Sequence, residues 1–289
     1  MLLNFSPGEL RTSFYPLLSF SIGDDMSVQI RFLLVACFLL GGTASAADFS
    51  FDGEKGRALV LNGEIQPGDA EKLQEVIRNQ PVEFMRASSL SLNSQGGSVT
   101  EALKLASIIE KSGLMARVNS GNTCASACFL LYVSSQFRSS DSDGNILIHR
   151  PYLTKVRTDI KGYNTDRNSQ QKSLAEMRAF MEERAVPSSL IDKMLNYPSN
   201  GAHRVTTQEL FEEVRHLSPT LEELTIKECG LSNRNIFSEE RDFGGNPGQD
   251  DLSCIRKFTM PLRWDYTRAV LGDVRFRQAW ALFREITND

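Results

Sequence analysis

The chain has 289 residues, of which 41% are hydrophobic and 24% are charged, and its formal net charge is −4. This length suits one large domain, or one domain with an appendage. Lys and Arg are scattered along the sequence and form no basic run. The composition therefore argues against a nucleic-acid-binding protein.

The N-terminal region has the pattern of an export signal. A short charged start at residues 26–31 precedes an apolar run at 32–40, and small residues follow up to an Ala-x-Ala pattern at Ala46. The apolar run is too short to span a bilayer comfortably. We therefore expect residues 26–46 to be a secretory signal peptide and the mature protein to be periplasmic or secreted.

Two features of this region leave alternatives open. Residues 1–25 contain two prolines and an acidic pair, which suit no export segment, so translation is expected to start at Met26. Residues 34–37 resemble a lipobox that ends at Cys37, which would make the protein a lipoprotein. This second interpretation is disfavoured because few apolar residues would remain in front of the cysteine.

Export would place the mature chain in an oxidising compartment, where cysteines can form disulfides. Cys229 and Cys254 lie in a polar region and could pair. Cys124 and Cys128 lie in an apolar stretch, and we expect both to be small buried thiols. No histidine stands at ligand spacing from either pair, so the sequence predicts no metal site.

Between residues 57 and 149, apolar strands alternate with helices. Strands are expected at 57–65, 88–93, 114–118 and 145–149, and helices from residue 67, at 100–112 and at 125–133. This alternation predicts an α/β domain with a largely parallel sheet. Ligands of such sheets bind at the carboxyl ends of the strands, where the Gly96–Gly97 turn and His149 are expected.

The rest of the chain is predicted to be mostly helical. Residues 152–167 are expected to form an exposed loop, and helices are expected at 169–184, at 188–196 and from Thr206, which has the character of an N-cap. After a glycine-rich loop at 244–248, aromatic residues indicate a final helical segment: Trp264, Phe276, Trp280 and Phe283. We assign residues 47–219 to the main domain and residues 220–289 to a mostly helical C-terminal extension.

Three segments together carry the parts of a serine hydrolase site. Ser126 lies in a run of small residues between Cys124 and Cys128, the glycine turn precedes it, and His149 follows it. A hydroxyl, a base and a turn with bare backbone N–H groups can perform acyl transfer. The sequence therefore favours a hydrolase.

The same segments resemble the proteolytic subunit of the Clp protease, within the wider crotonase-like superfamily. Residues 93–99 resemble the family's Ser-Pro-Gly-Gly turn, with Gln95 in place of the proline. Residues 124–128 stand where the family has its nucleophile, and residues 146–151 resemble its histidine-bearing strand, with Arg150 in place of a glutamine. The resemblance covers roughly residues 55 to 217.

The resemblance implies a ClpP/crotonase-like spiral of β-β-α units and an endopeptidase activity. Ser126 would be the nucleophile, His149 the general base, and the N–H groups of Gly97 and Ala127 the oxyanion hole. It further implies a peptide or unfolded-protein substrate, no cofactor, and assembly into a homo-oligomer. The chain would contact a membrane only through an uncleaved signal segment.

The third member of the catalytic triad is the main departure from the family. The family supplies an aspartate just before the segment written here as residues 204–210, where this chain has Ala202 and His203. Asn196 and Asn200 are candidates to orient the imidazole, and Asp192 lies too far upstream. A Ser–His dyad and a degenerate site remain alternatives.

Three other functions are compatible with these residues. A serine–lysine dyad, as in signal peptide peptidases, would use Lys161 or Lys172. A Clp-like binding or scaffold protein would use no nucleophile. A crotonase-type enzyme would act on acyl thioesters, although export separates the chain from coenzyme A.

Overall fold

The structure is a computed structural model. It describes residues 46–52, 57–151, 160–198, 200–236 and 248–287, and the side chains of residues 160–166 are not described. The expected signal peptide, apart from its last residue Ala46, and the region before it lie outside these ranges, as do residues 244–247. In the described ranges, no helix has both the length and the apolar character needed to span a membrane.

The main sheet has five strands in the order β1-β2-β3-β4-β6, and all neighbours are parallel except β1 and β2. Leucines at alternate positions of β2 and β3 are fully buried, which explains why these short segments form central strands. The five strands are β1 (Asp48–Phe51), β2 (Ala58–Asn62), β3 (Ser89–Asn93), β4 (Met115–Val118) and β6 (Arg138–Ser140).

A second, smaller sheet holds the segments on either side of the candidate nucleophile. It consists of β5 (Thr123–Ala125), β7 (Asn145–Ile148) and β8 (His203–Arg204), in the order β5-β7-β8. A bridge between Ser94 and Cys124 joins it to the end of β3. The chain leaving β3 and the chain leaving β5 are therefore neighbours.

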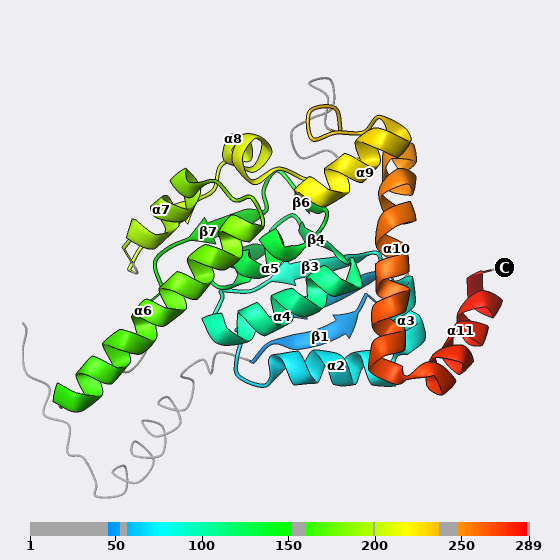
Figure 1. The fold of residues 1–289 in the computed structure, drawn as a ribbon, viewed down its shortest axis with the longest axis horizontal. Helices are drawn as coiled ribbons and strands as arrows, with labels where there is room; N and C mark the ends of the chain where they lie inside the picture. Colours follow the sequence, from blue (N-terminus) through cyan, green and yellow to red (C-terminus); the bar gives the residue numbers. More distant parts are fainter. Residues whose placement is uncertain (1–45, 53–56, 152–159, 199, 237–247, 288–289) are drawn as a thin grey trace, which may run out of the picture. The chain divides into compact units, whose positions relative to one another are not determined.

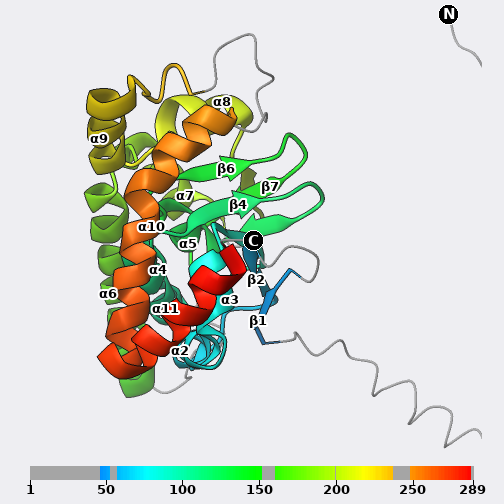
Figure 2. The same ribbon diagram turned by 90° about the vertical axis from the view of Figure 1, so that its right-hand side faces the viewer.

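The helices gather around α4, which contacts α2, α5, α6 and α10. Figures 1 and 2 show α4, α6 and α10 on one side of the strands. The helices are α2 (Asp69–Asn79), α3 (Pro81–Arg86), α4 (Val99–Ser112), α5 (Cys128–Ser134), α6 (Ile160–Glu183), α7 (Ser188–Asn196), α8 (Thr207–Glu209), a π-helix (Leu210–Val214), α9 (Pro219–Cys229), α10 (Gln249–Leu271) and α11 (Asp273–Thr287).

The C-terminal helices pack directly on the preceding domain. Gly113 ends α4 in the left-handed conformation, and a Cβ there would lie 2.4 Å from the Thr259 carbonyl oxygen of α10. Arg263 of α10 is buried and donates a hydrogen bond to the Gly113 carbonyl (3.0 Å), where the negative end of the α4 dipole lies. Burial lowers the pKa of Arg263 to about 9, so the guanidinium stays charged at neutral pH.

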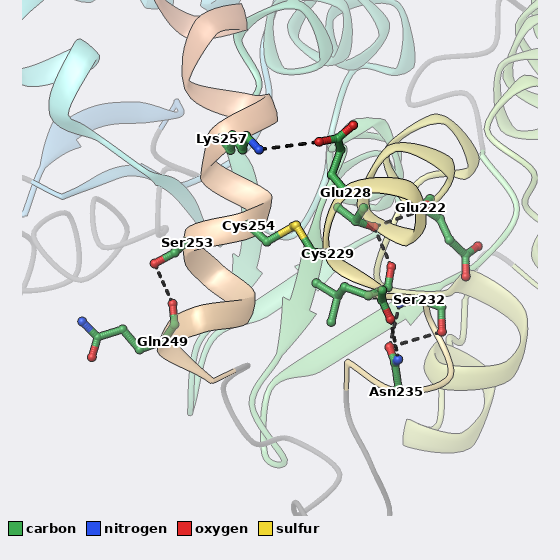
Figure 3. The surroundings of a disulfide bond; sticks show 12 residues. Glu222, Glu228, Cys229, Ser232, Asn235, Gln249, Ser253, Cys254 and Lys257 are labelled. Carbon is green, nitrogen blue, oxygen red and sulfur yellow. Dashed lines mark hydrogen bonds and ion pairs between the residues drawn. A yellow bond between two sulfur atoms is a disulfide. The ribbon is translucent and has the colours of Figure 1, made fainter.

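Two further contacts hold this helical layer together. Phe276, Ala279 and Phe283 of α11 form an apolar cluster with Val82 and Met85 of α3. A disulfide between Cys229 and Cys254 joins α9 to α10, and Figure 3 shows it beside the Lys257–Glu228 ion pair.

Several elements differ from the sequence-based expectations. Strand β5 occupies the start of the expected 125–133 helix because Ala125 pairs with Leu147, so α5 begins at Cys128. Residues 160–167 belong to α6 rather than to a loop. The short strands β1, β6 and β8 were not expected, because β6 and β8 are polar and β8 has only two residues.

Candidate active site

A cavity of about 850 Å³ opens where β3 and β5 end. Its wall includes Ser126, His149 and Gly97, three of the four residues that the sequence assigned to catalysis and the oxyanion hole. The fourth, Ala127, follows Ser126 and is buried. The tertiary structure thus brings the three separate segments together.

Ser126 forms a sharp turn between strand β5 and helix α5. Its φ angle is +54°, a left-handed conformation that L-residues other than Asn and Asp rarely adopt. Its N–H donates to the Leu147 carbonyl (2.8 Å), and the N–H of Ala125 donates to the Ser94 carbonyl (2.9 Å). Non-glycine residues in this conformation cluster at functional sites, where the surroundings enforce the strain.

The two cysteines on either side of this turn are joined by a disulfide. Our expectation of buried thiols at Cys124 and Cys128 is wrong, although both residues are fully buried. The turn at Ser126 brings their Cα atoms to 5.2 Å, which is within the range of disulfides. The sequence offered a signal that we did not use, the equal spacing of two cysteines around the serine.

The glycine turn packs against the serine turn. Gly96 and Gly97 have φ angles of +95° and +138°. A Cβ at Gly96 would lie 2.7 Å from the Ser126 Cβ and 2.9 Å from the Ala127 nitrogen, and a Cβ at Gly97 would lie 2.1 Å from the Ile65 carbonyl oxygen. Only glycine fits at these two positions, because the backbones approach too closely for a side chain.

Two backbone N–H groups at this contact have no acceptor among the residues that the structure describes. Over the described part of the chain, neither Gly97 nor Ala127 donates a hydrogen bond. By contrast, Ile65 donates to the Gly96 carbonyl (2.7 Å) and Ser98 donates to the Ile65 carbonyl (2.8 Å). Unpaired N–H groups beside a hydroxyl can stabilise an anion that forms there.

His149 follows β7 and is half-buried. Its Nδ1 atom lies 3.0 Å from the carbonyl oxygen of Arg150. A carbonyl oxygen only accepts hydrogen bonds, so Nδ1 is the donor, and in the neutral ring Nε2 carries the lone pair of a base. Among the contacts of the described residues, no hydrogen bond joins His149 to the Ser126 hydroxyl.

Of the side chains that we considered as a third catalytic member or a lysine base, none that the structure describes lines the cavity. Asn196 and Asn200 are exposed. Asp192 forms an ion pair with Arg178. Lys172 is exposed and lies 3.7 Å from Glu176, and the side chain of Lys161 lies outside the described part of the structure.

The position of the family's aspartate is occupied by a different network. His203 pairs with Ile148 across β7 and β8, and its Nε2 lies 3.0 Å from Glu209. Although burial alone would raise the pKa of Glu209, hydrogen bonds from Lys193, the Thr206 N–H and His203 lower it to about 2. This carboxylate is therefore ionised and engaged with His203, and it fixes β8 to the start of α8.

Helix α6 supplies a polar wall that the sequence analysis missed. Ser169, Gln170 and Ser173 line the cavity, and Gln170 donates a hydrogen bond to the Pro151 carbonyl (3.3 Å), two residues after His149. These three positions share one face of a helix, which is the signal that could have found them. Only the fold shows that this face turns toward the cavity.

Two buried carboxylates, Asp69 and Glu101, accept hydrogen bonds from backbone N–H groups next to the cavity. Burial raises the pKa of Asp69, which accepts a hydrogen bond from the Gln66 N–H (2.7 Å). Burial opposes ionisation of Glu101 as well, but hydrogen bonds from the Ala70 N–H and Lys104 lower its pKa. Neither carboxylate lines the cavity, and within the described ranges no three His, Cys, Asp or Glu side chains converge on a metal-binding point.

Comparison with known proteins finds a similarity to a known family in the region that holds this site. The family model for Clp protease matches residues 54–189, a stretch that includes both Ser126 and His149. This stretch, slightly less than half of the chain, is similar to the Clp protease family domain. No curated protein matches the chain.

Solved structures with the same kind of fold are numerous, with 321 matching chains. One is a point mutant of ClpP1 from Listeria monocytogenes, which is 17% identical and covers 54% of this chain and 85% of its own, with a TM-score of 0.42. The chain itself has an α/β fold with a mostly parallel sheet and a helical C-terminal region.

Proposed function

We propose that this chain is an exported serine endopeptidase that hydrolyses peptide bonds in peptides or unfolded proteins. The observation that carries the proposal is the strained turn at Ser126, which shares a cavity with His149 and lies beside two unpaired N–H groups. The Clp protease family domain over residues 54–189 supports a peptidase.

In the proposed reaction, the Ser126 hydroxyl oxygen attacks the substrate carbonyl while Nε2 of His149 accepts its proton. The N–H groups of Gly97 and Ala127 stabilise the negative charge on the tetrahedral oxygen. The imidazolium then protonates the leaving amine, and a water molecule activated by the same ring releases the acyl group.

The hydrogen bond from Nδ1 to the Arg150 carbonyl takes the orienting role of the family's aspartate. It selects the tautomer whose Nε2 can act as a base. A neutral carbonyl stabilises the imidazolium less than a carboxylate does, so we expect slower turnover than in a full Ser–His–Asp triad. The substrate must also bring His149 and Ser126 into hydrogen-bond distance, as catalytic contacts often tighten only when the substrate is bound.

The compartment limits the substrates. Residues 26–46 support export, and an exported peptidase has no ATP with which to unfold a folded protein. Short peptides and already unfolded chains are therefore the proposed substrates. Self-association into a homo-oligomer is part of the proposal because the family assembles in this way.

A second candidate function is a Clp-like binding or scaffold protein without catalysis. The observation that favours it is the lack of a Ser126–His149 hydrogen bond among the described residues. In this case the polar cavity would hold a peptide without cleaving it.

Labelling with a fluorophosphonate probe separates the two candidates. The wild-type protein should be labelled and should cleave an unfolded casein substrate, whereas Ser126→Ala should lose both activities by about a thousandfold or more. Ser189→Ala is the matched control, because Ser189 is exposed and bonds to Glu213 away from the cavity. A folded wild-type protein that is never labelled, but binds the unfolded substrate as tightly as Ser126→Ala does, would support the binding protein instead.

A further inference from the structure

We infer that the Cys124–Cys128 disulfide is the positioning element that holds Ser126 and the Ala127 N–H in reactive geometry, so that the protein reacts at its full rate only when this bond is formed. The inference rests on the proposed function. It assigns a catalytic contribution to two residues that touch no substrate.

The bond joins a strand to a helix across the nucleophile. Cys124 lies in β5 and Cys128 is the first residue of α5, so the ring that the disulfide closes contains only Ala125, Ser126 and Ala127 between its ends. A ring this small restricts every backbone angle of the turn. The disulfide therefore restrains both Ser126, which carries the hydroxyl, and Ala127, whose N–H belongs to the proposed oxyanion hole.

The turn needs such a constraint because its conformation is unfavourable. Ser126 has a φ angle of +54°, which a serine without a restraint leaves readily for the right-handed region. Relaxation of this angle would rotate the peptide group between Ser126 and Ala127 and redirect the Ala127 N–H. The Ser126 N–H donates to the Leu147 carbonyl (2.8 Å) and the Ser126 carbonyl accepts from the Phe129 N–H (3.0 Å), but these are single hydrogen bonds, whereas the disulfide is a covalent restraint on the same turn.

The glycine turn cannot replace the disulfide. Gly96 packs against Ser126 and Ala127, but this is a contact between backbones that can slide apart. Cys124 and Cys128 are fully buried, so a reductant reaches their bond only when the protein opens. The bond is thus a permanent support of the folded enzyme.

The second disulfide provides an internal comparison. Cys229–Cys254 joins α9 to α10, and none of the residues that it connects lines the cavity. Loss of either bond should lower the stability of the protein, but only loss of Cys124–Cys128 should slow the reaction of the protein that remains folded.

The test compares two double variants at a temperature at which both are folded. Cys124→Ala/Cys128→Ala should be labelled by the fluorophosphonate at least tenfold more slowly than wild type, with kcat for a peptide substrate reduced and KM little changed. Cys229→Ala/Cys254→Ala should keep the wild-type labelling rate within twofold. Equal labelling rates of wild type and Cys124→Ala/Cys128→Ala would overturn the inference.

A second measurement keeps the side chains of Cys124 and Cys128 and changes only the bond between them. It can be made even if Cys124→Ala/Cys128→Ala does not fold. In the Cys37→Ala/Cys229→Ala/Cys254→Ala background, the protein is refolded either with dithiothreitol or with glutathione disulfide, which takes two electrons and two protons from the dithiol. The oxidised form should react at least tenfold faster than the dithiol form. A wild-type protein that is never labelled contradicts the proposed function, whereas equal rates of two labelled forms contradict only the role of the disulfide.

Discussion

The cavity around Ser126 and the C-terminal helical layer have opposite physical characters. The cavity contains backbone in unfavourable conformations, unpaired N–H groups and a polar wall. The helical layer has apolar clusters, a disulfide and a buried arginine at a helix end. The strained backbone around Ser126 lowers the stability of the folded state. The packing of the C-terminal helices in the same compact unit must offset this loss.

The largest effect is expected from a substitution of His149, and it should change the rate of hydrolysis without changing stability. His149→Gln should reduce peptide hydrolysis by about a thousandfold, equivalent to about 4 kcal/mol of barrier, because the hydroxyl loses its base. The free energy of unfolding should change by less than about 0.5 kcal/mol. His203→Gln is the matched control, since it breaks the contact with Glu209 and should leave the hydrolysis rate within twofold.

Gly97→Ala should lower both activity and stability, because Gly97 lines the cavity and also packs closely against the backbone of Ile65. Its new Cβ would lie 2.1 Å from the Ile65 carbonyl oxygen, which forces the turn away from the bridge that Gly97 forms with Ile65. We expect a loss of about 3 kcal/mol in unfolding free energy and a labelling rate below one tenth of wild type. Gly121→Ala, which meets no atom within 4 Å, should cost only about 1 kcal/mol and leave labelling intact.

Phe283→Ala should affect stability alone. The side chain is 8% exposed and packs with the α3 cluster, so its loss should cost about 3 kcal/mol in chemical denaturation. The neighbouring Leu282→Ala removes a side chain that is 53% exposed and should cost less than about 0.5 kcal/mol. A lower labelling rate in folded Phe283→Ala would show that the two regions are coupled.

Glu209→Gln should give the smallest effect, and it depends on pH. The folded pKa of about 2 lies below the unfolded value of 4.5, so the carboxylate stabilises the fold above pH 4.5, and this contribution is lost as the pH falls toward 2. The variant should therefore be less stable than wild type by about 2 kcal/mol at pH 6, and the difference should vanish near pH 2. Glu212→Gln, which changes an exposed carboxylate, should show no such pH dependence.

The sequence could predict the elements whose signal is local. The strands at 57–65 and 88–93 and the helices at 100–112 and 188–196 all depend on neighbouring residues, and the structure has all four, the first three with shifted ends. The domain's resemblance to the Clp protease depended on three short motifs in order along the chain, and the family match covers them.

Sequence by itself determined which residues are available for chemistry: one serine in a run of small residues, one histidine after a strand, and two glycines that permit close backbone approach. Only the tertiary structure decided how they are arranged. It bent Ser126 into a left-handed turn closed by a disulfide, set the Arg150 carbonyl against Nδ1 of His149, and brought one face of α6 to the cavity. The physical reason is that periodicity and capping act over a few residues, whereas these three features depend on how strands and helices pack and how the backbone folds at their ends.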